Sequence, residues 1–261
     1  MQDILNGDRV FITGSSRGIG RAIALAMANA GAHVAVHYHK SAEAAELVAR
    51  EIRELRRECI VVQGDLEDAD QRARIVDTIG EQWGALDVLV ANAAATAFKP
   101  VTELRPYHLH RTYTLVVESL VDLVQRSLPL MTQSRHGRII TISSQGSQYT
   151  LPRYACIGAG KAAMEAMTRY LATELGPFGI TCNAISPGVI DTDSARYYAG
   201  DHYESFLSRV AEATPLGRLV QPDDVAAAVI MMASPYARMI TGQVVQVDGG
   251  ISLKTPGFEG L

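Results

Sequence analysis

A phenol and an ammonium group seven residues apart, Tyr154 and Lys161, are the first pair in this sequence whose types suit charge and proton chemistry. A tyrosine hydroxyl can donate a hydrogen bond to a developing oxyanion, and a nearby lysine charge can lower the pKa of that hydroxyl. Seven residues make two helical turns less about 20°, so on one helix the side chains share a face, about 10.5 Å of rise apart. The spacing predicts that both groups face one pocket from a helix over residues 154–175.

Residues 13–20, Thr-Gly-Ser-Ser-Arg-Gly-Ile-Gly, form a second motif, which follows an apolar stretch and precedes a helical pattern. A strand, a glycine turn and a helix in this order present backbone N–H groups and the positive end of the helix dipole to a pyrophosphate. A glycine turn alone is also compatible with a purely structural role. The residues predicted to contact a dinucleotide here are Gly14, Ser16, Arg17, Gly18, Ile19 and Gly20.

The end of the second expected strand decides which dinucleotide binds, because an acidic residue there bonds the 2′-hydroxyl of NAD and repels a 2′-phosphate. That position holds Tyr38, and His39, Lys40 and Ser41 follow it, with Arg17 in the glycine turn. Cationic and hydroxyl side chains therefore surround the expected phosphate position, which predicts NADPH rather than NADH. The alternative is that Lys40 and Arg17 are ordinary surface residues.

Alternating strands and helices supply the scaffold for these motifs. Apolar β-rich stretches predict seven strands, at residues 10–13, 34–37, 60–63, 88–91, 138–142, 181–185 and 244–247. Helical patterns occur at residues 18–30, 41–55, 68–81, 107–134, 154–175 and 222–233. Near-continuous apolar strands joined by helices predict an α/β fold of the doubly wound Rossmann type, a seven-stranded parallel sheet with helices on both faces.

Length and composition favour a single domain over residues 1–261, which would be the NADP-binding domain that the motifs above predict. A formal charge of −4 argues against a nucleic-acid partner. The three cysteines are far apart without a CxxC pair, so neither a disulfide framework nor a metal site is expected. No signal-peptide pattern and no apolar stretch of about 18 residues occurs, which predicts a cytoplasmic protein without a membrane partner.

One connection, residues 191–214, is unusually long and aromatic. It follows the sixth expected strand and carries Tyr197, Tyr198, Tyr203 and Phe206. Long connections in compact domains are often functional, so the segment is predicted to be a lid over an apolar substrate. An amphipathic helix that packs on a neighbouring subunit is the alternative.

The pattern Thr-Gly-x-x-x-Gly-x-Gly resembles the cofactor motif of the short-chain dehydrogenase/reductase family. Further matches span nearly the whole chain: Asp65, Asn92-Ala93-Ala94, Ser143-Ser144, Asn183 and Pro187-Gly188, each after an expected strand. Ala94 departs from the family pattern, which usually has glycine there.

This resemblance implies a reductase and assigns further residues to its cofactor. Asp65 would hold the adenine, and Asn92 would lie by the adenosine ribose. Ile190 and Thr192 would contact the nicotinamide amide and a neighbouring phosphate. The other residues implied at the cofactor are Leu66, Lys161, Pro187 and Gly188.

Tyr154 precedes Lys161 by seven residues, whereas most of the family has four, and this Tyr-x6-Lys spacing resembles the enoyl-acyl-carrier-protein reductases of the same family. In enoyl thioester reduction, hydride lands on the β-carbon, three bonds from the oxygen that gains charge, so a displaced tyrosine suits the reaction. We expect Tyr154 to donate a hydrogen bond to the developing enolate oxygen. Lys161 would anchor the nicotinamide ribose and lower the pKa of the tyrosine.

Three features near this pair leave alternatives open. Ser144 lies where ordinary members have a catalytic serine, and it either bonds the substrate carbonyl or merely ends the strand. The asparagine usual in the long fourth helix is missing, because the aligned residues 114–117 are Thr-Leu-Val-Val. Gly158 and Gly160 each cost a helix about 1 kcal/mol relative to alanine, which indicates either close approach by another group or simple helix packing.

The leading hypothesis is therefore NADPH-dependent reduction of a trans-2-enoyl thioester in fatty-acid or polyketide biosynthesis, on acyl carrier protein or coenzyme A. A ketoreductase for a polyketide or other carbonyl substrate is the second hypothesis. A dinucleotide-binding regulator without turnover is the third. The resemblance also implies a homotetramer built through the fourth and fifth helices and the segment near 244–250, and a possible acyl carrier protein partner.

Overall fold

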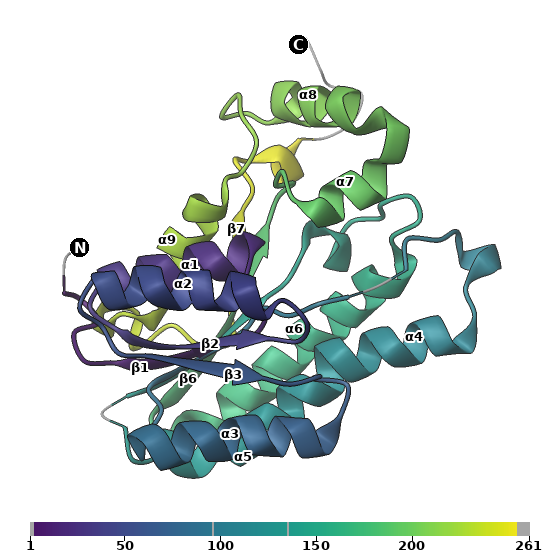
Figure 1. The fold of residues 1–261 in the computed structure, drawn as a ribbon. Coiled ribbons are helices and arrows are strands. Elements are labelled where there is room, and N and C mark those ends of the chain that lie inside the picture. The colour runs from purple at the N-terminus through teal and green to yellow at the C-terminus, as the bar shows by residue number, and fades with distance from the viewer. Residues whose placement is uncertain (1–2, 96, 135, 255–261) are drawn as a thin grey trace.

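The computed structural model describes residues 3–95, 97–134 and 136–254, and in that part of the chain one sheet of seven parallel strands lies between layers of helices (Figure 1). The ends of the predicted 1–261 domain thus fall outside the described residues. The strand order is β3-β2-β1-β4-β5-β6-β7, which confirms the predicted doubly wound α/β fold. The strands are β1 (Arg9–Ile12), β2 (His33–Tyr38), β3 (Cys59–Gln63), β4 (Val88–Ala91), β5 (Gly137–Ile142), β6 (Ile180–Pro187) and β7 (Val244–Val247).

Each strand lies within two residues of its predicted limits, because both faces of the sheet are buried and the apolar stretches are almost unbroken. The α-helices that connect them are α1 (Gly18–Asn29), α2 (Ala42–Glu54), α3 (Ala69–Trp83), α4 (Pro106–Tyr113), α5 (Ser119–Met131), α6 (Ala155–Leu175), α7 (Asp193–Ala199), α8 (Tyr203–Ala213) and α9 (Pro222–Ala233).

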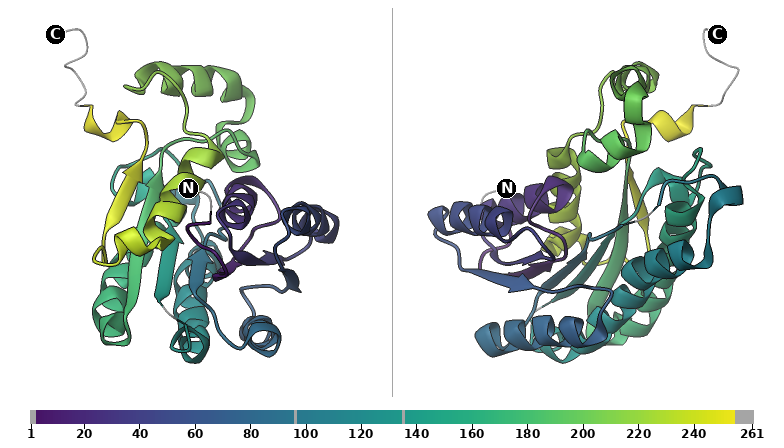
Figure 2. Two further views of the ribbon diagram at one scale, coloured as in Figure 1. Left: turned by 90° about the vertical axis from the view of Figure 1, so that its left-hand side faces the viewer. Right: turned by 45° about the vertical axis from the view of Figure 1, so that its right-hand side comes forward.

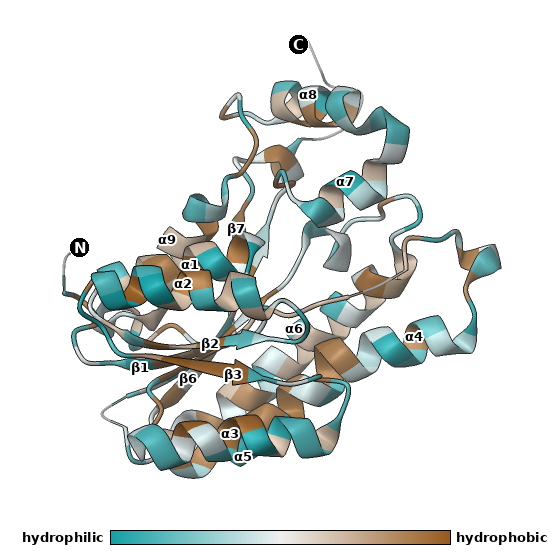
Figure 3. Cartoon of the chain, in the orientation of Figure 1, coloured by the Kyte–Doolittle hydropathy of each residue, from teal (hydrophilic) through white to brown (hydrophobic). Residues whose placement is uncertain are grey.

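Two apolar clusters hold the helices on opposite faces of the sheet. One joins α1, α2 and α9 to the strands, with Met27 and Val229 fully buried. The other joins α3, α5 and α6, with Leu120 and Met164 almost fully buried. The two layers are separate in Figure 2, and Figure 3 shows apolar residues along the strands that they cover.

The helical stretch predicted at residues 107–134 is helical from Pro106 to Met131, but it is not one regular α-helix. The chain forms α4, then a π-helical segment at Thr114–Glu118, then α5. Inside this stretch the Ser119 hydroxyl donates to the Leu115 carbonyl at 2.6 Å, and Thr114 donates to the Glu118 carboxylate at 3.1 Å. Side-chain bonds of this kind compete with the backbone ladder, and they accompany the widened turn.

The long connection at 191–214 contains α7 and α8, which form a projection at the top of the molecule in Figure 1. Thr192 begins α7, because its hydroxyl accepts a hydrogen bond from Ala195 N–H at 3.2 Å. No helix among the described residues is both long and apolar enough for a bilayer crossing.

Candidate active site

The glycine turn after β1 is held by two side chains from other strands. Gly14 has a φ of +64°, which favours glycine, and its N–H donates to His37 Nδ1 at 2.9 Å. Asn92 Nδ2, after β4, donates to the carbonyls of Thr13 at 2.9 Å and Gly14 at 3.2 Å. The turn therefore has a fixed shape at the carboxyl edge of the sheet, where parallel α/β sheets bind ligands.

Gly20 lets the first helix approach this turn. A Cβ atom at Gly20 would lie 2.3 Å from the Gly14 carbonyl oxygen and 2.6 Å from Asn92 Nδ2. The helix itself starts without a side-chain cap at Arg17, in contrast to α3, where Asp68 accepts from two backbone N–H groups. The N–H groups at the start of α1 are therefore left for a ligand, and the residues present fit a pyrophosphate.

His37 is a buried residue of this site that the sequence reasoning missed. Because its Nδ1 accepts from Gly14, its Nε2 carries the proton and donates to the Gly64 carbonyl at 3.0 Å. Burial is the main cause that lowers its pKa to about 4. The ring is therefore neutral at neutral pH and links the ends of β1, β2 and β3.

Of the predicted 2′-phosphate residues, residues 38–41 lie at the end of β2 and Arg17 lies at the start of α1, and two of the five are near carboxylates. Arg17 pairs with Asp193 of α7 at 3.2 Å, and both side chains are exposed. His39 lies 3.6 Å from Asp65. Lys40 and Ser41 are exposed, and Tyr38 is half-buried against the core.

Tyr154, Lys161 and Ser144 converge on the end of β5. The Tyr154 hydroxyl lies 2.9 Å from Ser144 Oγ, and Lys161 Nζ donates to the Ile142 carbonyl at 2.5 Å. Tyr154 is the N-cap of α6 and already has helical backbone angles, so the two side chains do share a helix face. Ser144 thus follows the strand and bonds the phenol, and its bond to a substrate carbonyl stays a prediction.

The expected lowering of the Tyr154 pKa by Lys161 is wrong for this structure. Burial raises the pKa of Tyr154, and it outweighs the hydrogen bond from Ser144, which lowers it. Burial also lowers the pKa of Lys161 to about 8, against the opposing charge of Glu165. The ammonium group is directed at the Ile142 carbonyl instead of the phenol.

Aromatic side chains from the long connection cover Tyr154. The Tyr198 ring packs edge-on to Tyr154, with centroids 5.8 Å apart, and Phe206 packs on the far side of Tyr198. Phe98, in the loop after β4, stacks on Tyr154 at 5.6 Å. The Tyr198 hydroxyl also donates to the Pro152 carbonyl at 2.9 Å. Residues 191–214 therefore contact the Tyr154 ring directly.

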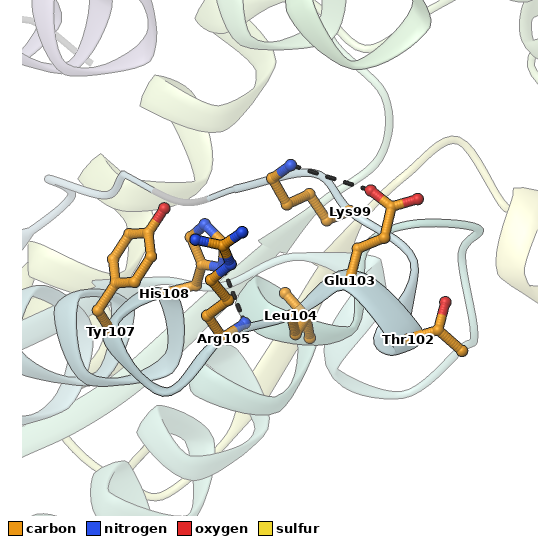
Figure 4. Close-up of a pocket in the computed structure, with 7 residues that line it drawn as sticks. All are labelled: Lys99, Thr102, Glu103, Leu104, Arg105, Tyr107 and His108. Atoms are coloured by element: carbon orange, nitrogen blue, oxygen red, sulfur yellow. Dashed lines mark hydrogen bonds and ion pairs between the residues drawn. The ribbon is translucent and has the colours of Figure 1, made fainter.

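Two cavities adjoin at Lys99. One, of about 390 Å³, is lined by Tyr154, Gly146 and Ala159 among others. The other, of about 460 Å³, lies between the loop after β4 and the start of α4, and its lining includes Lys99, Arg105, Tyr107 and His108 (Figure 4). In this second cavity the charged groups of Lys99 and Glu103 lie 3.9 Å apart.

The remaining predicted cofactor residues occupy the same edge of the sheet with different exposure. Ile190 is buried and pairs with Val220 in a parallel bridge. Leu66 has its side chain in the core, so only its backbone can face a ligand. The other residues lie in the glycine turn, at the start of α1, or at and after the end of β6: Ser16, Gly18, Ile19, Pro187, Gly188 and Thr192.

The two helical glycines of α6 have different neighbours. A Cβ atom at Gly158 would lie 2.5 Å from the Gly146 carbonyl oxygen, so here another backbone segment approaches the helix. A Cβ atom at Gly160 would lie 3.3 Å from Thr112 Cγ2 of α4, a tight contact in the packing between these two helices. Each of the two alternatives therefore holds at one glycine.

The part of this chain that matches known proteins includes the residues of this site. A family model described as enoyl-(acyl carrier protein) reductase matches residues 14–252. The chain is 37% identical to the 1-cyclohexenylcarbonyl-CoA reductase of Streptomyces collinus, over 95% of this chain and 88% of that protein. It is 35% identical to the 3-oxoacyl-[acyl-carrier-protein] reductase FabG of Staphylococcus aureus, over 92% and 96% of the two chains.

Solved structures of known proteins are also similar to this chain over nearly its whole length. A short-chain dehydrogenase of Burkholderia cenocepacia in complex with NADP has a TM-score of 0.86 and 34% identity, and the match covers 95% of this chain and 99% of that one. A 7α-hydroxysteroid dehydrogenase in complex with NADH has a TM-score of 0.89 and 32% identity, over 95% and 96%. The fold and its cofactor edge are thus common to proteins of several specificities.

Proposed function

The chain belongs to the short-chain dehydrogenase/reductase family, and from this premise we propose that it is an NADPH-dependent reductase of a trans-2-enoyl thioester on acyl carrier protein or coenzyme A. The observation that carries the proposal is the position of Tyr154, seven residues before Lys161, with its phenol against the end of β5. The 1-cyclohexenylcarbonyl-CoA reductase supports it, because that name describes a thioester whose double bond is conjugated to the carbonyl.

The cofactor would lie along the carboxyl edge of the sheet. The uncapped start of α1 and the turn at Gly14 suit the pyrophosphate. Arg17 and Lys40 would supply positive charge for a 2′-phosphate, and His39 a ring N–H donor. When bound, NADPH supplies the hydride. A relative of known structure binds NADP in the same fold, which supports this choice of dinucleotide.

Tyr154 would act on the thioester oxygen. The phenol would stabilise negative charge on that oxygen by donating a hydrogen bond when the β-carbon accepts a hydride, and the α-carbon would then take its proton from solvent. Its raised pKa keeps the hydroxyl protonated and able to donate at neutral pH. Lys161 would hold the nicotinamide ribose, and the Ile142 carbonyl fixes the direction of its ammonium group.

Segment 191–214 is proposed as the lid of this site, since Tyr198 covers Tyr154 and an apolar cover excludes water from the reacting atoms. A carrier-linked acyl chain would enter beside it, through the cavity that Tyr154 lines. We also propose a cytoplasmic homotetramer, which is consistent with exposed apolar side chains at Tyr170, Met239 and Leu253.

Ketone reduction is the second candidate, favoured by the 2.9 Å contact between Ser144 and Tyr154 and by the FabG relative. The test compares NADPH oxidation with crotonyl-CoA and acetoacetyl-CoA for wild type, Tyr154→Phe and the control Tyr170→Phe, whose side chain is exposed on the same helix. Faster use of crotonyl-CoA, lost in Tyr154→Phe alone, is the expected result. Faster use of acetoacetyl-CoA would replace the leading proposal with the second.

A further inference from the structure

Three consecutive residues at the end of β5 are each bonded to a residue of α6 or its N-cap. Each hydrogen bond joins a backbone or side-chain oxygen at the strand end to a charged or polar group of the helix or its N-cap. The distances between donor and acceptor are 2.5 to 2.9 Å. The pairs are Ile142 with Lys161, Ser143 with Glu165, and Ser144 with Tyr154. The helix positions are separated by seven and four residues, so they lie on one face.

Glu165 is the member of this set that the proposed reaction does not use. Its side chain is buried, with 6% of the residue exposed. One of its oxygens, Oε1, accepts from Ser143 Oγ at 2.5 Å and from Ser147 Oγ at 2.6 Å. Such short O–H···O distances are typical of hydrogen bonds to an ionised acceptor. These bonds are about twice as strong as bonds to a neutral acceptor.

A buried carboxylate is costly, because removing an ion from water has an effective penalty of several kcal/mol unless good partners replace the solvent. A glutamine or an apolar residue could fill the same place on α6 without that penalty. The two serine hydroxyls belong to the segment that also contains Ser144. The carboxylate therefore binds the chain on both sides of the residue that contacts the phenol of Tyr154.

We propose that Glu165 is a positioning residue, whose carboxylate fixes segment 143–147 against α6 and so holds the Ser144 hydroxyl at the phenol of Tyr154. There is little room for the segment to shift, because a Cβ at Gly158 would meet the Gly146 carbonyl at 2.5 Å. The inference rests on the proposed thioester reduction, but it holds for an enoyl or a keto substrate alike.

Glu165→Gln tests the inference, with kcat and KM measured on whichever thioester the wild type reduces. The amide keeps the size of the side chain but removes its charge. We expect kcat to fall by about 10-fold or more, as for other small misplacements of a reacting group, with KM for NADPH changed less than twofold. In a Tyr154→Phe background the same substitution should cause no further fall, since Glu165 acts through the phenol. Glu174→Gln, exposed on the same helix, is the control.

Ser147→Ala provides a milder variant if Glu165→Gln fails to fold. It removes one of the two hydroxyl donors and should lower kcat about threefold, again only when Tyr154 is present. An unchanged kcat in Glu165→Gln overturns the inference. An equal fall in both backgrounds, with a lowered Tm, also overturns it, because that pattern is a general loss of structure.

A crystal structure of Glu165→Gln separates this inference from the proposed function. Widening of the 2.9 Å distance between Ser144 Oγ and Tyr154 Oη supports a positioning role, and an unchanged distance contradicts it. If the wild type reduces neither thioester, only the proposed function fails, and this distance still decides the role of Glu165.

Discussion

His37 joins the glycine turn to the end of β3 through one neutral imidazole ring. Folded protein keeps this ring unprotonated down to its pKa of about 4, whereas the unfolded chain takes up the proton near pH 6.5. Below pH 6.5 the unfolded state therefore binds more protons, and stability falls as the pH falls toward 4.

Replacing His37 with glutamine should remove this pH dependence. Linkage gives a loss of about 2.5 kcal/mol for the wild type between pH 7 and 4.5 from this group, and none from glutamine. Chemical denaturation of both proteins across that range measures the difference, with His202→Gln on the exposed surface as the control. Parallel stability curves for wild type and variant would show that His37 does not titrate in this way.

Spacing predicted that Tyr154 and Lys161 share a helix face, and the family resemblance added Ser144, which lies at the same strand end in the structure. Residue types and spacing did not predict a role for His37 or Glu165. Each of these is a single polar residue within an apolar or helical pattern, and its function depends on partners that only the folded chain brings near. The direction of the Tyr154 pKa was also missed, because burial cannot be read from spacing.

Aromatic side chains hold segment 191–214 against Tyr154. Tyr198→Ala removes the contacts with Tyr154 and Phe206, each worth about 0.5–1.5 kcal/mol beyond area burial. We expect faster hydrogen exchange in this segment and a KM for the acyl thioester raised about fivefold, with NADPH affinity unchanged. Tyr197→Ala, whose side chain is largely exposed, should have a smaller effect. Equal exchange rates in Tyr198→Ala and wild type would show that the ring does not hold the segment.

The loop after β4 and the start of α4 carry the second cavity, which adjoins the first at Lys99. If the carrier end of the substrate lies there, Lys99 and Arg105 face its phosphates. The double variant Lys99→Glu/Arg105→Glu should raise KM about 10-fold for crotonyl-CoA but not for crotonyl-N-acetylcysteamine, which has no phosphate. Arg50→Glu on α2 is the control. A similar rise for both substrates would exclude a phosphate contact.

At the level of elements, the strands were predicted closely because burial on both faces makes them apolar throughout. The π-helical turn between α4 and α5 was not predicted. It depends on the hydrogen bonds from the Thr114 and Ser119 side chains to Glu118 and to the Leu115 carbonyl. Sequence periodicity alone cannot distinguish such a turn from the regular helix on either side.

For the whole molecule, the doubly wound fold was predicted from the alternation of strands and helices and the rule that parallel crossovers are right-handed, whereas the order of the strands was not predicted. Assembly does not follow from that rule. Tyr170 on α6 and Met239 and Leu253 near β7 are 66%, 89% and 84% exposed, and they are apolar side chains that the proposed tetramer would bury.

Met239→Glu/Leu253→Glu should therefore convert the proposed tetramer into smaller species, because a buried unpaired charge disfavours an apolar interface. Light scattering after size-exclusion chromatography gives the mass of each species, and Leu47→Glu on α2 serves as the control. A monomeric wild type would remove the proposal of a tetramer.

The bonds that hold the two ends of the site differ in sequence separation, which bears on the order of folding. Those at the end of β5 join residues 10 to 22 positions apart, whereas Asn92 meets the glycine turn across 78 or 79 positions. Closing the longer loop costs about 1 kcal/mol more in chain entropy, and contacts between distant segments form more slowly. The strand–helix unit around Tyr154 is thus favoured to assemble ahead of the nucleotide turn, and pulse-labelled amide protection during refolding would record that sequence of events.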